Sequence, residues 1–126
     1  MILLSFSVLI IAGCAKRTSS DLSSLPEVSM SLEPIELSVE NHNWLDVVVF
    51  VVHGGQRTRI VTVTAAKNAS ALIPEFALRH HGQIRLLAHA VGNPEPFLSE
   101  VIVVQRGMRI AWTLESDLKR SSVAIW

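Results

Sequence analysis

The 126-residue chain contains a single cysteine, Cys14, and its 11 basic side chains balance its 11 acidic ones. A disulfide within the chain is impossible, so its stability must come from packing. A formal charge of zero argues against nucleic acid as a partner, because proteins that bind nucleic acid usually carry a basic excess. The sequence also lacks G-x-S-x-G, a glycine-rich phosphate loop and H-E-x-x-H. We therefore expect no cofactor and no catalytic residue.

The histidines and serines offer little for a metal or catalytic site. Zinc usually takes three or four protein ligands, and the sequence provides no cluster of cysteines to supply them. The adjacent pair His80 and His81 would point to opposite faces of a strand. The other histidines are His42, His53 and His89. We expect no metal site and no enzyme, and the alternative is a small envelope hydrolase whose site is assembled from distant residues.

The position of Cys14 indicates where the protein works. Residues 1–11, MILLSFSVLII, are uncharged and too short to cross a bilayer, which needs about 20 helical residues. They match the apolar core of an export signal. With Ile11, Ala12, Gly13 and Cys14 in the places of a lipobox, this stretch resembles a bacterial lipoprotein signal. The resemblance implies cleavage before Cys14, a diacylglycerol on its sulfur and an acylated new amino terminus. The alternative is a buried, inert core cysteine.

The chain divides into a signal peptide at residues 1–13, an acylated cysteine with a tether at 14–34, and a domain at 35–126. Residues 15–34 contain six serines and two prolines and show no apolar period, which is typical of a linker. As a flexible coil, this tether would span roughly 25 Å. We therefore expect a domain held by lipid to a membrane of the cell envelope and facing outward from the cytoplasm.

The domain carries the pattern of an all-β protein. From Ile35 onward apolar and polar residues alternate, which indicates a half-buried strand. The pair Gly54 and Gly55 predicts a tight turn between two such segments, and residues 76–81 predict a helical turn. The predicted strands are residues 35–40, 46–52, 58–64, 69–73, 83–91, 99–104 and 108–115. The expected fold is a single antiparallel β-sandwich of about seven strands.

Four stretches of this domain carry a second resemblance. They read SVEN, DVVVFVVHGGQRTRIVTV, IRLLAHAVG and SEVIVVQRG, and lie within residues 36–114. Together they resemble small bacterial lipoproteins of unassigned function with an immunoglobulin-like or transthyretin-like sandwich domain. This resemblance implies a fold and supplies no catalytic residue.

The segment DVVVFVV, residues 46–52, is apolar on both faces, although a strand in a two-layer sandwich should have one polar face. In one register Val48, Phe50 and Val52 point outward, and in the other they point inward. The outer face is then covered by the chain's own tail, residues 122–126, or by the tether. Otherwise it contacts an envelope protein or a second copy of the chain.

Arginines provide the second indication of a partner. Arg57 and Arg59 share one face of the segment that follows the glycine turn. Guanidinium groups suit phosphates and carboxylates, so these residues could contact anionic lipid headgroups or acidic envelope sugars. Other arginines that could contribute are Arg85, Arg106 and Arg109. The sequence thus predicts a membrane-anchored, non-enzymatic binding or structural lipoprotein.

Overall fold

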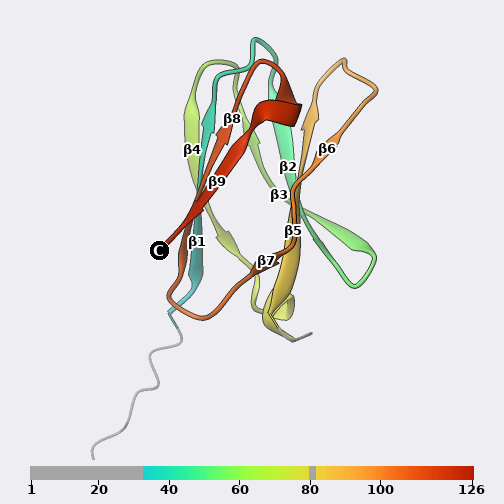
Figure 1. The fold of residues 1–126 in the computed structure, drawn as a ribbon. Helices are drawn as coiled ribbons and strands as arrows, with labels where there is room; N and C mark the ends of the chain where they lie inside the picture. Colours follow the sequence, from blue (N-terminus) through green and yellow to red (C-terminus); the bar gives the residue numbers. More distant parts are fainter. Residues whose placement is uncertain (1–32, 80–81) are drawn as a thin grey trace, which may run out of the picture.

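The computed structural model describes residues 33–79 and 82–126, which form two β-sheets packed face to face (Figure 1). The predicted all-β sandwich is confirmed. The strands are β1 (Ile35–Asn41), β2 (Val47–His53), β3 (Gln56–Val63), β4 (Asn68–Ile73), β5 (Gln83–Ala90), β6 (Phe97–Leu98), β7 (Ile102–Val103), β8 (Arg109–Leu114) and β9 (Ser122–Ile125). Two short 3₁₀ helices, η2 (Glu75–Leu78) and η3 (Leu118–Arg120), lie between strands.

The four-stranded sheet has the order β4-β1-β8-β9, and the second sheet has the order β3-β2-β5-β6 with β7 also paired to β5. All these pairings are antiparallel except β1 with β8, which run parallel. The chain changes sheets between β1 and β2, β3 and β4, β4 and β5, and β7 and β8. Strands that are close in sequence therefore contribute to both sheets, and one hydrophobic core forms between the two sheets.

The core follows directly from alternation along the strands. In β1, Ile35, Leu37 and Val39 are at most 1% exposed, whereas the residues between them are exposed. Fully burying an aliphatic side chain of this size contributes about 1.5–3 kcal/mol. The largest fully buried side chains from the other strands are Trp112, Ile84, Leu86, Ile110, Leu114, Val47, Val49, Val51 and Val63. No disulfide is needed to hold this core.

The β2–β3 hairpin turns at Gly54 and Gly55, as predicted. Their φ angles are +55° and +79°, and a two-residue hairpin turn with both angles positive matches the twist of the flanking strands. The register then shifts, because Val49 lies opposite Val61 while Phe50 lies opposite Arg59. Ile60 is the extra residue of this β-bulge and packs against the core beside Val61.

The predicted continuous strand at residues 99–104 is wrong. Within that range only residues 102–103 form a strand, β7, and the two-residue strand β6 precedes it; both pair with β5. Ser99 interrupts the ladder, since its hydroxyl accepts a hydrogen bond from the Leu86 amide at 2.8 Å while its own amide donates to the Leu86 carbonyl at 2.8 Å. The Ser99 hydroxyl thus takes the place of a backbone carbonyl as hydrogen-bond acceptor, and the chain bends away from regular strand pairing.

The apolar tail does not cover β2. Residues 122–125 form β9, which pairs with β8 in the other sheet. The preceding helix η3 reverses the chain directly after β8, and its first turn is stabilised by the Asp117 carboxylate accepting the Lys119 amide at 3.1 Å. Because the reversal is so short, the tail returns along β8 and cannot reach the far sheet.

The predictions for the signal, Cys14 and most of the tether concern residues 1–32, which lie outside the described residues. The helical turn predicted at 76–81 is present in part as η2, and residues 80–81 also fall outside them. Within 33–79 and 82–126, no helix has the length and apolar character needed to cross a bilayer.

Candidate functional site

The outer face of the five-stranded sheet is the surface that sequence reasoning singled out, and the structure decides its register. Val47, Val49 and Val51 are fully buried in the core. The alternate residues of β2 therefore point outward, and each is half-buried. These outward residues are Val48, Phe50 and Val52. This interior strand of the sheet thus presents an entirely apolar outer row.

Arginines flank this apolar row on both neighbouring strands. Val52 lies opposite Arg57 of β3 and opposite Arg85 of β5, and Phe50 lies opposite Arg59 of β3. Directly opposed residues in a sheet have their Cβ atoms about 4.5–5.5 Å apart, so each guanidinium stem runs beside an apolar neighbour. This arrangement explains why the β2 side chains are half-buried and not fully exposed. We call the outward residues of β2 with these three arginines the arginine face.

The arginine face carries uncompensated positive charge. None of its three arginines forms an ion pair with any described residue. The Arg59 guanidinium donates to the Thr62 hydroxyl on its own strand, which leaves its charge in place. Asp46 directly precedes β2 and so lies at the end of the strand away from Val52. Its carboxylate accepts a hydrogen bond from the Ala65 amide at 2.9 Å.

The other two arginines considered from the sequence lie elsewhere. Arg106 forms an ion pair with Glu75 at 2.9 Å, and Arg109 approaches Glu36 at 3.5 Å. Both pairs are largely exposed, so they add little stability, but they do neutralise these cations locally. Arg106 and Arg109 therefore do not join the arginine face.

The apolar row continues onto β5 and β6, through two leucines that were not among the residues predicted to face a partner. Phe50 lies opposite Leu87, and Leu87 lies opposite Leu98, which is 39% exposed. The alternation in QIRLLAHA places Arg85, Leu87 and His89 on one face and could have revealed the first of these leucines. Leu98 could not be found in this way, because a two-residue strand has no measurable period.

The three described histidines, His42, His53 and His89, contact different groups. His42 is the best-connected one, with its Nε2 2.9 Å from Glu40 and its Nδ1 3.6 Å from Glu115. The hydrogen bond with Glu40, with a smaller contribution from Glu115, raises the pKa of His42 above its usual value. The nearby Ser116 hydroxyl donates a hydrogen bond to the His42 backbone carbonyl at 3.2 Å.

No group of three or more histidine, cysteine or acidic side chains within 33–79 and 82–126 is arranged to hold a metal ion. His89 lies on the outer face of β5, and its Nε2 is 2.8 Å from the Asn93 carbonyl oxygen. His53 packs edge-on against Phe76 with ring centroids 5.8 Å apart. His80 and His81 lie outside the described residues.

Comparison with known proteins adds a structural neighbour. No family model matches the chain, and no curated protein matches it. A solved structure, described as the NMR structure of the protein from Eubacterium rectale, is similar over 75% of this chain and 87% of that one. The sequence identity is 12% and the TM-score is 0.42.

Proposed function

We propose that this protein is a lipid-anchored, non-enzymatic binding protein of the bacterial cell envelope that holds an acidic partner on the arginine face. The observation that carries the proposal is the apolar row of β2 flanked by three arginines without acidic partners among the described residues. An apolar surface lowers its free energy when it is covered. Unpaired guanidinium groups select a partner that carries carboxylates or phosphates.

The shape of the face supports a macromolecular partner. The β2–β3 turn extends away from the other strands (Figure 1). A small hollow of about 210 Å³, lined in part by Val52 and Arg85, lies beside this turn. Val52 and Arg57 lie beside this turn, so a large partner can reach them. An interface of this kind would have an apolar centre and a polar rim that supplies specificity and salt sensitivity.

The proposed anchor limits where the partner is found. With Cys14 acylated, several acyl chains on one residue would hold the protein to the membrane, because each buried methylene contributes about 0.8 kcal/mol. A tether of roughly 25 Å keeps the domain close to that surface. The partner is then an acidic component of the same envelope.

Photo-crosslinking in the native envelope tests the binding face. A benzophenone side chain replaces Phe50 in one strain and, as a matched control, Ser38 in another, because Ser38 is exposed on the outer face of the opposite sheet. We expect adducts from position 50 that are lost when Arg57→Glu and Arg85→Glu are added. Equal adducts from both positions, or adducts that survive the charge reversal, would contradict the proposal.

The anchor is tested separately with Cys14→Ser. The native protein should partition into the detergent phase and carry a mass increase that corresponds to acylation at Cys14. The variant should remain uncut or appear in the aqueous phase. An unmodified Cys14 in the mature chain would rule out the anchor but would leave the binding face to be judged by crosslinking.

A further inference from the structure

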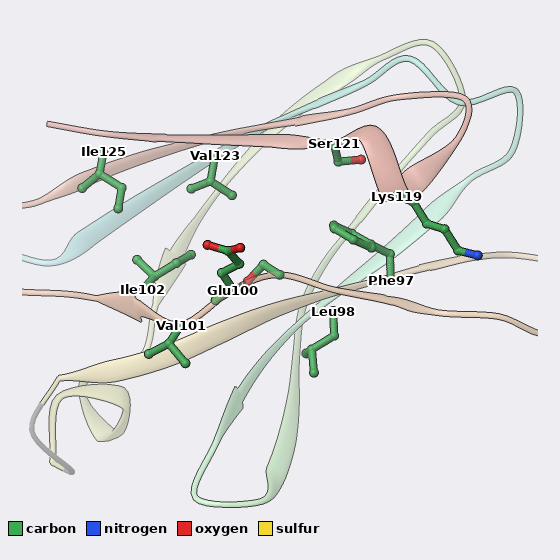
Figure 2. Close-up of a pocket in the computed structure, with 10 residues that line it drawn as sticks. Phe97, Leu98, Glu100, Val101, Ile102, Lys119, Ser121, Val123 and Ile125 are labelled. Carbon is green, nitrogen blue, oxygen red and sulfur yellow. Dashed lines mark hydrogen bonds between the residues drawn. The ribbon is translucent and has the colours of Figure 1, made fainter.

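The sandwich is open along one side, where a groove separates β9 from the β6–β7 segment. It has a volume of about 510 Å³ and lies between the last strand of one described sheet and the interrupted last strands of the other. Figure 2 shows Phe97 and Ile102 from the lower wall facing Val123 and Ile125 from β9, while Leu98 and Val101 point away. The groove is thus walled by apolar side chains from both sheets.

Among the described residues, no strand pairs with β9 on the side that faces away from β8. Arg109 and Trp126 exchange two hydrogen bonds, with N–O distances of 3.0 and 3.1 Å, which fixes the phase of the ladder. Hydrogen-bonded pairs alternate with non-bonded ones in an antiparallel ladder, so Ala124 also bonds toward β8. The N–H and C=O groups of Val123 and Ile125 therefore point to the free edge, and their side chains line the groove.

The free edge lacks the features that usually prevent pairing. Residues 122–125, SVAI, contain no charge and no proline, and they form the last described strand of their sheet. Edge strands are commonly protected by lysine, proline or a bulge, because exposed backbone groups otherwise accept another strand. The edge of β9 is consequently open to strand addition.

Glu100 adds a charge to this apolar groove. Its side chain lines the cavity between Ile102 and Phe97 and points toward β9 (Figure 2). Its carboxylate has no ion pair or hydrogen bond with any residue of the described ranges. Lys119, at one end of the groove, approaches Glu95 at 3.9 Å. The carboxylate of Glu100 is therefore free to meet a cation from outside the domain.

From these observations we infer that an extended segment of a partner protein adds to the free edge of β9, with alternate apolar side chains entering the groove and a lysine or arginine reaching Glu100. A strand side-chain period of two sends every second residue inward, and backbone hydrogen bonds to Val123 and Ile125 supply the register. A groove of 510 Å³ accommodates a few such side chains. This surface is distinct from the arginine face, so each can fail without the other.

A second copy of the chain fits less well as the occupant. Pairing β9 with β9 of another copy would place only Ser122, Val123, Ala124 and Ile125 along the edge, and none of these supplies a cation to Glu100. The uncompensated carboxylate thus favours a basic strand from another protein.

Amide hydrogen exchange of the full chain in detergent micelles tests this inference with a defined probe. The probe is a blocked heptapeptide of sequence TVTKTVT, and its matched control is TVTETVT. At a probe concentration about ten times its dissociation constant, exchange at Val123 and Ile125 should slow about tenfold, because exchange then proceeds from the free fraction. Ala124 and Trp126, already bonded toward β8, should change little. The control peptide should produce no slowing.

Two variants separate a lost contact from a lost fold. Glu100→Lys should reverse the preference, so that TVTETVT now protects the edge. Val123→Pro removes an outward N–H that β8 does not use and should abolish protection by either peptide, while the Ala124 and Trp126 amides stay protected to show that β9 is intact.

Three results would overturn the inference. Absence of protection by TVTKTVT would exclude strand addition by a basic segment. Equal protection by both peptides would exclude the role of Glu100. Protection of Val123 and Ile125 that rises with protein concentration alone would identify a second copy as the occupant.

Discussion

Replacing Asn41 should destabilise the domain strongly, because its side chain is buried and hydrogen-bonded on both its nitrogen and its oxygen. Asn41 is 1% exposed at the end of β1. Its Nδ2 donates to the carbonyls of Leu45, Val63 and Thr64 at 3.0, 3.2 and 3.2 Å, and its Oδ1 accepts the Asn43 amide at 2.9 Å. One side chain therefore joins the β1–β2 loop to the corner where the chain passes from β3 to β4.

The expected loss of unfolding free energy follows from the hydrogen-bonding groups that lose their partners when Asn41 is replaced. The side-chain nitrogen of Asn41 carries two N–H groups, which the three carbonyls share, and its oxygen accepts one further hydrogen bond. Asn41→Ala therefore removes about three hydrogen bonds. At a net contribution of about 1 kcal/mol each, the loss is about 3 kcal/mol, and unsatisfied buried groups increase it. A domain of this size is stable by about 5–15 kcal/mol, so the variant should remain folded with a clearly lower midpoint.

Asn41→Asp should add a pH dependence that the alanine variant lacks. The new carboxylate oxygen would face three carbonyl oxygens, and this repulsion should raise the pKa of the new carboxyl in the folded state. A raised folded pKa means that the folded state binds more protons than the unfolded one. Stability should then be highest below the unfolded value of about 3.9 and fall as pH rises through the folded value.

Urea unfolding at pH 5 and pH 8 measures both effects. The three tryptophans report on it, because Trp112 is 1% exposed while Trp44 and Trp126 are 83% and 64% exposed. Asn68→Ala is the control, since Asn68 is exposed, its side chain has no hydrogen bond with a described residue, and its replacement should change stability by less than about 0.5 kcal/mol. A loss below about 1 kcal/mol in Asn41→Ala, or an Asn41→Asp loss equal at both pH values, would refute this reasoning.

Two further predictions concern backbone geometry and pH. Gly82 has a φ of +64° and a Cβ there would lie 2.4 Å from the Val104 carbonyl oxygen, whereas Gly54 has a φ of +55° with open space around it. Gly54→Ala should therefore lower the free energy of unfolding by about 1–2 kcal/mol from the backbone angle alone. Gly82→Ala should lower it distinctly more in the same urea assay. Equal losses in the two variants would show that the close approach to Val104 does not matter. The raised pKa of His42 implies that its charged form stabilises the fold below about pH 6.5 and that this contribution disappears as pH rises through the raised value. Glu40→Gln should lower the His42 pKa measured by NMR titration and destabilise the domain at pH 5.5 more than at pH 8.5, and an unchanged titration would contradict the assigned cause.

The sequence by itself determined the local elements of this protein. Alternation at Ile35, Leu37 and Val39 predicted β1, and the pair Gly54 and Gly55 predicted the hairpin turn that the structure contains. Both signals depend on neighbouring residues, because the side-chain period of a strand and the φ preference of glycine are properties of short segments. The two-layer fold followed from the number and spacing of such segments.

Tertiary structure alone decided how these elements meet. Arg57 and Arg85 flank Val52 only because β2 lies between β3 and β5, and Glu100 faces β9 across the groove only because the two sheets end side by side. The buried role of Asn41 likewise depends on carbonyls from a distant corner. Strand order and register are set by packing of the whole chain. The apolar tail is the clearest example. Its composition suited either sheet, and the short reversal at η3 placed it beside β8.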